Sequence, residues 1–350
     1  MSHQLHRAGL RALRIGGFSR LLRPRALLWL SGLLLLALGL LLFGVSRGSL
    51  PVPTSSLARA LFMPQMLSGE QHYVVWDLRL PRLCMALLCG AMLGMAGAAM
   101  QSMTRNGLAD PGLIGVKEGA SVAVLTLVFS FPAVSVVWRP LAGMAGGLLA
   151  AGLVIALARD VSRPRFVLLG IGLSWTFAAG IGLFMTTADV RDVQTAMLWL
   201  AGSLQAASWP LLGVALCWAL PAALILLLTA RAADVAQLGN QAATGLGVRL
   251  MLLNGLRVFA PVLLTAASVS CVGSLGFVGL IAPHMARFLL RGGERALLWG
   301  SALLGGLLVL VADTIGRLAF APLQLPAGIV IALVGGPFFL LLLWQRRDRL

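Results

Sequence analysis

Three arginines at the ends of apolar stretches are the residues of this chain best suited to bind an acidic partner. Arg79 and Arg82 stand in the segment Arg-Leu-Pro-Arg that begins one apolar stretch, and Arg317 lies near the end of another. Arginine presents a planar, permanently charged fork that pairs with carboxylates. A charge beside a bilayer is costly, so its presence there suggests a function. On one side of a membrane, the three would form a cationic docking surface for a protein with glutamates at its rim.

The same arginines also have a purely structural interpretation. Long arginine side chains near the ends of membrane helices extend toward the polar interface. Arg317 also follows Asp313 by four residues, the spacing at which opposite charges pair on a helix. The arrangement along the chain favours the docking and the structural interpretations equally.

A second candidate contact site lies in the polar segment 231–249. Within it, Gly239 and Gly247 bracket a short helix-forming stretch whose apolar stripe includes Ala243 and Leu246. A short amphipathic helix between two membrane spans can dock into a groove of a peripheral protein. A solvated loop is the alternative.

Residues suited to catalysis or metal binding are not grouped along the chain. The only lysine, Lys117, follows Val116, so the Gly-Lys-Ser/Thr step of a phosphate-binding loop is absent. The four histidines lie in different segments, and the four cysteines lie in apolar stretches as small buried residues would. We therefore predict no catalytic residue, no metal site and no cofactor in this chain.

The composition predicts an all-α polytopic membrane protein. Hydrophobic residues make up 59% of the 350 residues and charged residues only 11%, whereas soluble domains carry about 25% charged residues. The net charge of +16 is almost entirely arginine in short segments between apolar stretches, which is the pattern that sets membrane orientation. Without a polar, aromatic-containing surface, nucleic-acid binding is not expected.

The apolar stretches predict about ten membrane spans. They lie near residues 26–45, 79–103, 118–131, 141–158, 166–187, 208–229, two within 250–290, 296–312 and 326–344. The region 250–290 could instead be one long helix, but two helices there place the basic C-terminus with the other arginine-rich segments on the cytoplasmic side. The positive-inside rule therefore favours ten spans and two cytoplasmic termini.

This pattern divides the chain into a single membrane domain and two tails. Residues 1–25 are expected to form a basic cytoplasmic tail, for which an amphipathic helix on the membrane surface is one available form. Residues 26–345 form the transmembrane domain, and residues 346–350 a short cytoplasmic tail. The row of Gly90, Gly94 and Gly97 predicts close helix packing, or alternatively helices that shift during transport.

Several motifs together identify a family resemblance that covers nearly the whole chain. The motifs are Arg79-Leu-Pro-Arg82, Gly97-Ala-Ala-Met-Gln101, Arg105-Asn-Gly-Leu-Ala-Asp-Pro-Gly-Leu-Ile-Gly115, Gly276-Phe-Val-Gly-Leu-Ile-Ala-Pro-His-Met-Ala-Arg287, Ala312-Asp313 with Arg317, and Leu325-Pro-Ala-Gly328 through Gly335-Gly-Pro337. With them the chain resembles the permease subunits of FecCD or BtuC type ABC importers for ferric siderophores, haem and cobalamin. It departs from the family's usual pattern at Gly107, where proline is common, and at Asn240-Gln241, where acidic residues are common.

The resemblance implies a type II ABC importer permease of the bacterial inner membrane. Such a permease forms a homo- or heterodimer, binds two ATP-hydrolysing subunits that carry ATP and magnesium, and receives substrate from a periplasmic binding protein. It implies that Arg79, Arg82 and Arg317 dock the binding protein, and that the stretch Gly239–Gly247 contacts the ATPase. Ferric siderophore is the expected substrate because it is common in the family, with haem and cobalamin as alternatives.

Two other classes of membrane protein fit these residues less well. An ATP-independent secondary carrier usually needs carboxylates within the membrane, and these are nearly absent from the spans. A membrane-embedded enzyme would need a polar catalytic cluster in the spans, and the sequence shows none. Both classes are therefore disfavoured.

Overall fold

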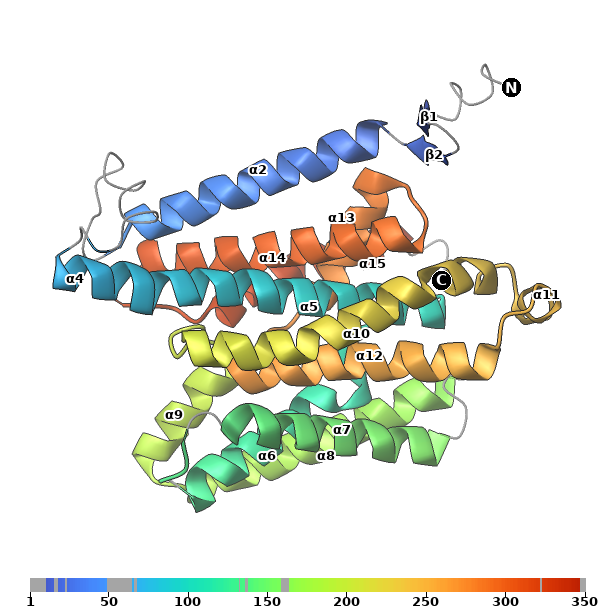
Figure 1. Cartoon of the computed structure of the whole chain (residues 1–350). Coiled ribbons are helices and arrows are strands. Elements are labelled where there is room, and N and C mark those ends of the chain that lie inside the picture. Colours follow the sequence, from blue (N-terminus) through green and yellow to red (C-terminus); the bar gives the residue numbers. More distant parts are fainter. Residues whose placement is uncertain are drawn as a thin grey trace.

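A bundle of long helices forms the body of the protein in the computed structural model (Figure 1). The structure describes residues 11–15, 18–22, 24–48, 65, 68–131, 133–135, 138–158, 164–321 and 323–346. Within these ranges, seven helices are long and apolar enough to cross a membrane, and two further apolar helices are shorter. The prediction of an all-helical polytopic membrane protein is confirmed for the bundle.

Ten helices correspond to the ten predicted spans. They are α2 (Pro24–Ser46), α5 (Leu80–Thr104), α6 (Val116–Ser130), α7 (Trp138–Ala158), α8 (Pro164–Thr187), α10 (Trp209–Ala236), α12 (Leu250–Val272), α13 (Val278–Leu290), α14 (Glu294–Leu318) and α15 (Ala327–Arg346). The remaining elements are the short helices α4 (Gly69–His72), η3 (Tyr73–Arg79), η4 (Pro111–Ile114), α9 (Val190–Leu200) and α11 (Asn240–Gly245). Because α4 and η3 run directly into α5, the continuous helical segment begins at Gly69, whereas the sequence predicted a start at residue 79.

The ambiguous region 250–290 contains two helices, as the charge distribution predicted. Helix α12 ends where Gly273 takes a positive φ of 76°, a backbone conformation that glycine adopts without strain. Residues 273–276 form no helix, and α13 then begins at Val278. A single continuous helix across this region is therefore excluded.

The N-terminal segment differs from the surface helix that the sequence left open. Strands β1 (Arg11–Ile15) and β2 (Phe18–Leu22) pair antiparallel, with Arg11 opposite Leu22. The sequence between them is Gly-Gly, and a two-residue glycine connection between two extended segments is a recognised hairpin signal. An amphipathic helix is therefore wrong for these two segments.

Helix α5 runs through the centre of the bundle, between α14 on one side and α10 and α12 on the other (Figure 1). Its three aligned glycines allow this close packing. A methyl group added to Gly90 would overlap the backbone of Gly305, and one added to Gly94 would overlap the carbonyl of Ser301. Gly97 lies equally close to Gly279 of α13. The predicted small-residue packing is thus confirmed, because backbones approach each other directly at these points.

Helices α6, α7 and α8 form a second group, which packs against α12 through α6 and α7 (Figure 1). The two ends of the bundle carry different short elements. Helices α4 and α9 lie at one end, and α11 projects from the other (Figure 1). We call these the α4 end and the α11 end, and each holds one of the predicted docking surfaces.

Candidate functional site

The three predicted docking arginines come together at the α4 end of the bundle. Arg79 is the last residue of η3, Arg82 lies in the first turn of α5, and Arg317 lies in the last turn of α14. Arg79 and Arg82 both lie close enough to Arg317 to repel it electrostatically. Sequence reasoning therefore placed these residues correctly at one end of one bundle, and their binding role stays a prediction.

Arg82 is held by a buried carboxylate on the neighbouring helix. Its Nη2 lies 2.8 Å from Oδ1 of Asp313, and its Nε donates to both carboxylate oxygens at 3.0 Å. Its Nη1 donates to the side-chain oxygen of Gln324 at 2.9 Å. Asp313 is fully buried, and its ion pair is with Arg82 across two helices, whereas spacing alone suggested Arg317 as its partner. A bidentate geometry of this kind fixes the arginine in place.

Arg79 and Arg317 hold the end of α2. Arg79 Nη1 donates to the carbonyl oxygen of Val45 at 2.6 Å, and Arg79 is only 6% exposed. Arg317 donates to the carbonyl oxygens of Gly44 and Arg47, each at 3.0 Å. The last carbonyls of a helix have no partner within the helix, and the last turn of α2 contains no basic residue of its own. The two arginines of other helices therefore cap it.

Arg47 is a fourth arginine at this end that sequence reasoning did not select. Its side chain is exposed, and its carbonyl oxygen accepts the hydrogen bond from Arg317. Its place directly after the first span is the signal that could have identified it. With Arg79, Arg82 and Arg317, it forms what we call the arginine cluster.

Helix α11 makes the second predicted surface, at the opposite end of the protein (Figure 1). Gly239 precedes it with a φ of 110° and Gly247 follows it with a φ of 83°. No atom would obstruct a side chain at either position, so the backbone conformation alone accounts for glycine there. The amide of Val248 also donates to the carbonyl of Ala243 at 3.0 Å. The short helix predicted between the two glycines is present.

The apolar residues of this segment face in different directions. Ala243 is completely buried, whereas Leu238 is 69% exposed and Leu246 is 66% exposed. Ala243 therefore packs against the chain itself and is not part of an exposed apolar stripe, and its predicted role in the ATPase contact stays a prediction. The exposed apolar side chains beside α11 are Leu246 and Leu238.

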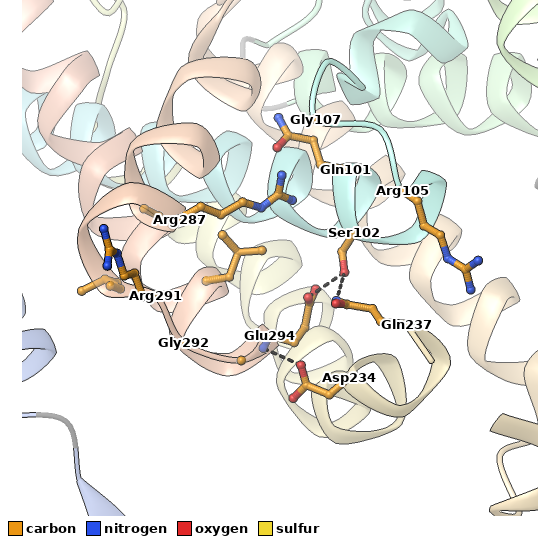
Figure 2. Close-up of a pocket in the computed structure, with 14 residues that line it drawn as sticks. Gln101, Ser102, Arg105, Gly107, Asp234, Gln237, Arg287, Arg291, Gly292 and Glu294 are labelled. Atoms are coloured by element: carbon orange, nitrogen blue, oxygen red, sulfur yellow. Dashed lines mark hydrogen bonds between the residues drawn. The ribbon is translucent and has the colours of Figure 1, made fainter. Parts of the chain in front are cut away.

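A polar network around the buried ion pair of Arg257 and Glu294 lies at the α11 end, and sequence reasoning missed it. Figure 2 shows its part around Glu294. Glu294 forms an ion pair with Arg257 and accepts a hydrogen bond from Ser102 Oγ at 2.6 Å. Gln237 donates to the same hydroxyl at 3.2 Å, and the amide of Glu294 donates to Asp234 at 2.8 Å. The network thereby joins α5, α10, α12 and α14. An arginine within an otherwise apolar stretch was the signal that could have revealed it.

The network borders a cavity of about 560 Å³ at the same end. Figure 2 shows Arg287 extending across this cavity from α13, with Arg291 at its side. No group of three or more histidine, cysteine, aspartate or glutamate side chains that could hold a metal ion occurs in the described parts of the chain. The chemistry visible here is charge pairing and hydrogen bonding between helices.

The fold and its two surfaces can now be compared with known proteins. The sequence profile of the FecCD transport family matches residues 34–345. The chain belongs to the FecCD transport family. It is accordingly a membrane-spanning permease of the ABC transporter class, and the secondary-carrier interpretation is not favoured.

Known relatives extend over most of the chain. The iron(3+)-hydroxamate import system permease FhuG of Bacillus subtilis is 37% identical over 287 residues, which are 79% of this chain and 85% of FhuG. The hemin transport system permease HmuU of Yersinia pestis is 34% identical over 289 residues, covering 81% of this chain and 86% of HmuU. A solved structure described as an inward-facing metal-chelate type ABC transporter is 29% identical, with a TM-score of 0.80 and coverage of 91% of this chain and 99% of that one.

Proposed function

We propose that this chain is the permease subunit of an ATP-driven importer that moves a ferric siderophore from the periplasm to the cytoplasm by alternating access. The observation that carries the proposal is the similarity of most of the chain to a permease named for iron(3+)-hydroxamate import. A relative named for hemin transport and one named for cobalamin import are only slightly less similar. Haem and cobalamin are therefore the alternative substrates within the family.

The two surfaces suit two different partners. The arginine cluster would receive a periplasmic binding protein through its acidic rim, and α11 would contact one of two ATP-binding subunits, which carry ATP and magnesium. We place the α11 end in the cytoplasm of a bacterium, with the bundle in the inner membrane and both termini cytoplasmic. Arginines concentrate at this end: Arg25, Arg105, Arg165, Arg231, Arg249, Arg287, Arg291 and Arg295.

Reconstitution of transport tests the proposal directly. The permease would be copurified from its native membrane with its partners, placed in proteoliposomes, and offered ferric hydroxamate, ferric citrate, haem and cobalamin. We expect uptake of a ferric siderophore that requires both ATP and the binding protein. Uptake of haem or cobalamin alone would assign the alternative substrate, and uptake without ATP or any copurified ATPase would overturn the proposal.

A charge reversal at Arg47 tests the docking role of the arginine cluster. Arg47→Glu removes an exposed cation and leaves the Arg82–Asp313 ion pair intact. We expect the binding protein to associate about fivefold more weakly at low salt, since an exposed charge pair contributes up to about 1 kcal/mol. Surface binding in immobilised nanodiscs measures this. Arg191→Glu, an exposed arginine of α9 at the same end, is the control, and an equal loss there would indicate nonspecific attraction.

An apolar-to-polar change at Leu246 tests the contact with the ATPase. Leu246→Ser removes an exposed apolar side chain next to α11 and should weaken association of the ATPase and slow ATP-dependent uptake several-fold. The exposed Met251 of α12 provides the control variant Met251→Ser, for which little change is expected. Normal copurification of the ATPase with Leu246→Ser would contradict the assignment of α11 as its contact site.

A further inference from the structure

A second and smaller cavity, of about 180 Å³, lies beside the polar network at the α11 end. The end of α5, the end of α10, the start of α11 and the first turns of α12 enclose it. Its polar lining residues are Ser102, Thr104, Arg105, Gln237, Asn240, Asn254 and Arg257. Among the described residues that line it, two are arginines and none is an aspartate or a glutamate. The cavity therefore has cationic and amide groups and no acidic wall.

Arg257 gives this cavity its most demanding group. The residue is 2% exposed, and its Nη2 is occupied by the ion pair with Glu294. Its Nε and Nη1 have no hydrogen-bond partner in the described part of the chain. Guanidinium nitrogens can only donate hydrogen bonds, and leaving charged donors unpaired in a buried place is costly. A buried cation with two unpaired donor nitrogens favours a ligand that accepts hydrogen bonds. Both nitrogens are inaccessible to a water molecule, so the Arg257 side chain would have to turn toward the cavity to reach such a ligand.

The surroundings of Arg257 add further positive potential. Arg105 is fixed by a hydrogen bond from its Nη2 to the carbonyl oxygen of Ala236 at 2.8 Å. Figure 2 shows its side chain extending away from Glu294, so that the carboxylate does not neutralise it. Leu250 and Leu253 of the first turn of α12 also line the cavity, and the start of a helix carries a partial positive charge. Arg105 and the start of α12 thus add positive potential that the carboxylate of Glu294 does not offset.

We propose that this cavity binds a phosphate group, coordinated by Arg257 and Arg105 with the side-chain amide of Asn254. An oxyanion only accepts hydrogen bonds, which matches the unpaired donors. The volume is ample for one phosphate group together with several water molecules. The group could belong to a free inorganic phosphate ion or to the headgroup of an anionic lipid, because the cavity lies where the membrane meets the cytoplasm in the proposed orientation.

Binding here would respond to the position of α11. The cavity is lined by residues of α5, α10, α11 and α12, with Asn240 contributed by α11 itself. A shift of α11 relative to α12 changes the cavity, so a bound phosphate group would favour one arrangement of the two helices. By linkage, a partner that moves α11 on binding would change the affinity for phosphate by the same factor by which phosphate changes the affinity for that partner.

The test measures binding rather than transport, so its outcome is independent of the proposed function. The full chain, delipidated in a neutral detergent, is dialysed to equilibrium against radiolabelled inorganic phosphate at constant ionic strength set with chloride. In parallel, the chain in nanodiscs of phosphatidylglycerol and phosphatidylcholine is released and examined by native mass spectrometry for retained phosphatidylglycerol. Saturable binding of one phosphate per chain would assign the free ion, and selective retention of phosphatidylglycerol would assign the lipid headgroup.

Asn254→Asp is the decisive variant. It keeps the size of the side chain and leaves the Arg257–Glu294 ion pair in place, but puts a negative charge in the cavity wall. We expect it to weaken whichever form of binding is observed by at least about tenfold. Arg291→Gln is the matched control, because Arg291 lines only the larger neighbouring cavity, and it should bind as the unaltered chain does. Absence of both forms of binding, or equal binding by Asn254→Asp, would overturn the proposal.

Discussion

Gly94→Val is expected to prevent stable packing of the central helices. Even the first carbon of a side chain at this position would overlap the carbonyl of Ser301 in α14, and neither backbone can rotate away as a flexible side chain could. Overpacking of a close-packed interior costs about 1–3 kcal/mol, and more where backbones must separate. We expect a loss of about 3 kcal/mol or more in the free energy of unfolding, seen as a lower thermal midpoint and a poor yield of monodisperse protein.

Gly152→Val is the matched control for this variant. Gly152 lies in α7, also within a predicted span, and no atom lies within 4 Å of an added carbon. The substitution should leave the thermal midpoint nearly unchanged, because valine is a better helix former than glycine and meets no obstacle. A Gly94→Val protein that unfolds at the temperature of Gly152→Val would show that α5 and α14 are not packed as described.

Glu294→Ala is expected to destabilise the α11 end of the bundle strongly. The substitution removes the carboxylate from Arg257, which is 2% exposed, and also leaves Ser102 without its acceptor. Removing one partner of a buried ion pair costs about 3–5 kcal/mol, because the other charge stays buried and unpaired. Thermal unfolding of the purified protein, followed by tryptophan fluorescence, measures the loss.

Two further variants separate this cause from a general effect of losing a glutamate. Glu70→Ala removes an exposed glutamate and should change the stability little. The double variant Glu294→Leu with Arg257→Met replaces both charges by apolar groups, so it should recover most of the stability that Glu294→Ala loses. Equal destabilisation by Glu294→Ala and Glu70→Ala would show that the pair is not buried.

The membrane spans and the meeting of the three arginines could be predicted because they depend on local patterns. Apolar length determines where a helix can cross a bilayer, and alternating crossings then bring Arg79, Arg82 and Arg317 to one end. The division of residues 250–290 into two helices followed from the arginine distribution. Close packing at Gly94 likewise followed from the spacing of small residues.

The partners of these residues could not be predicted, because they depend on three-dimensional packing. Arg79 and Arg317 donate to backbone carbonyls of α2, and every residue of the sequence has a carbonyl. Arg257 and Glu294 pair across 37 residues, and nothing in their spacing relates them. The inward orientation of Ala243 depends on how α11 turns back toward α12, which a six-residue helix does not encode in its periodicity.

The capping of α2 by distant arginines has a consequence for biosynthesis. Helix α2 is synthesised long before α14, and most of its side chains are exposed. The carbonyl of Gly44 receives its partner, Arg317, only 273 residues later in the chain. Asp313, which fixes Arg82, also arrives with α14. A nascent or truncated chain that stops before α14 therefore presents an incomplete α4 end, and only a polypeptide that includes α14 can offer the whole arginine cluster.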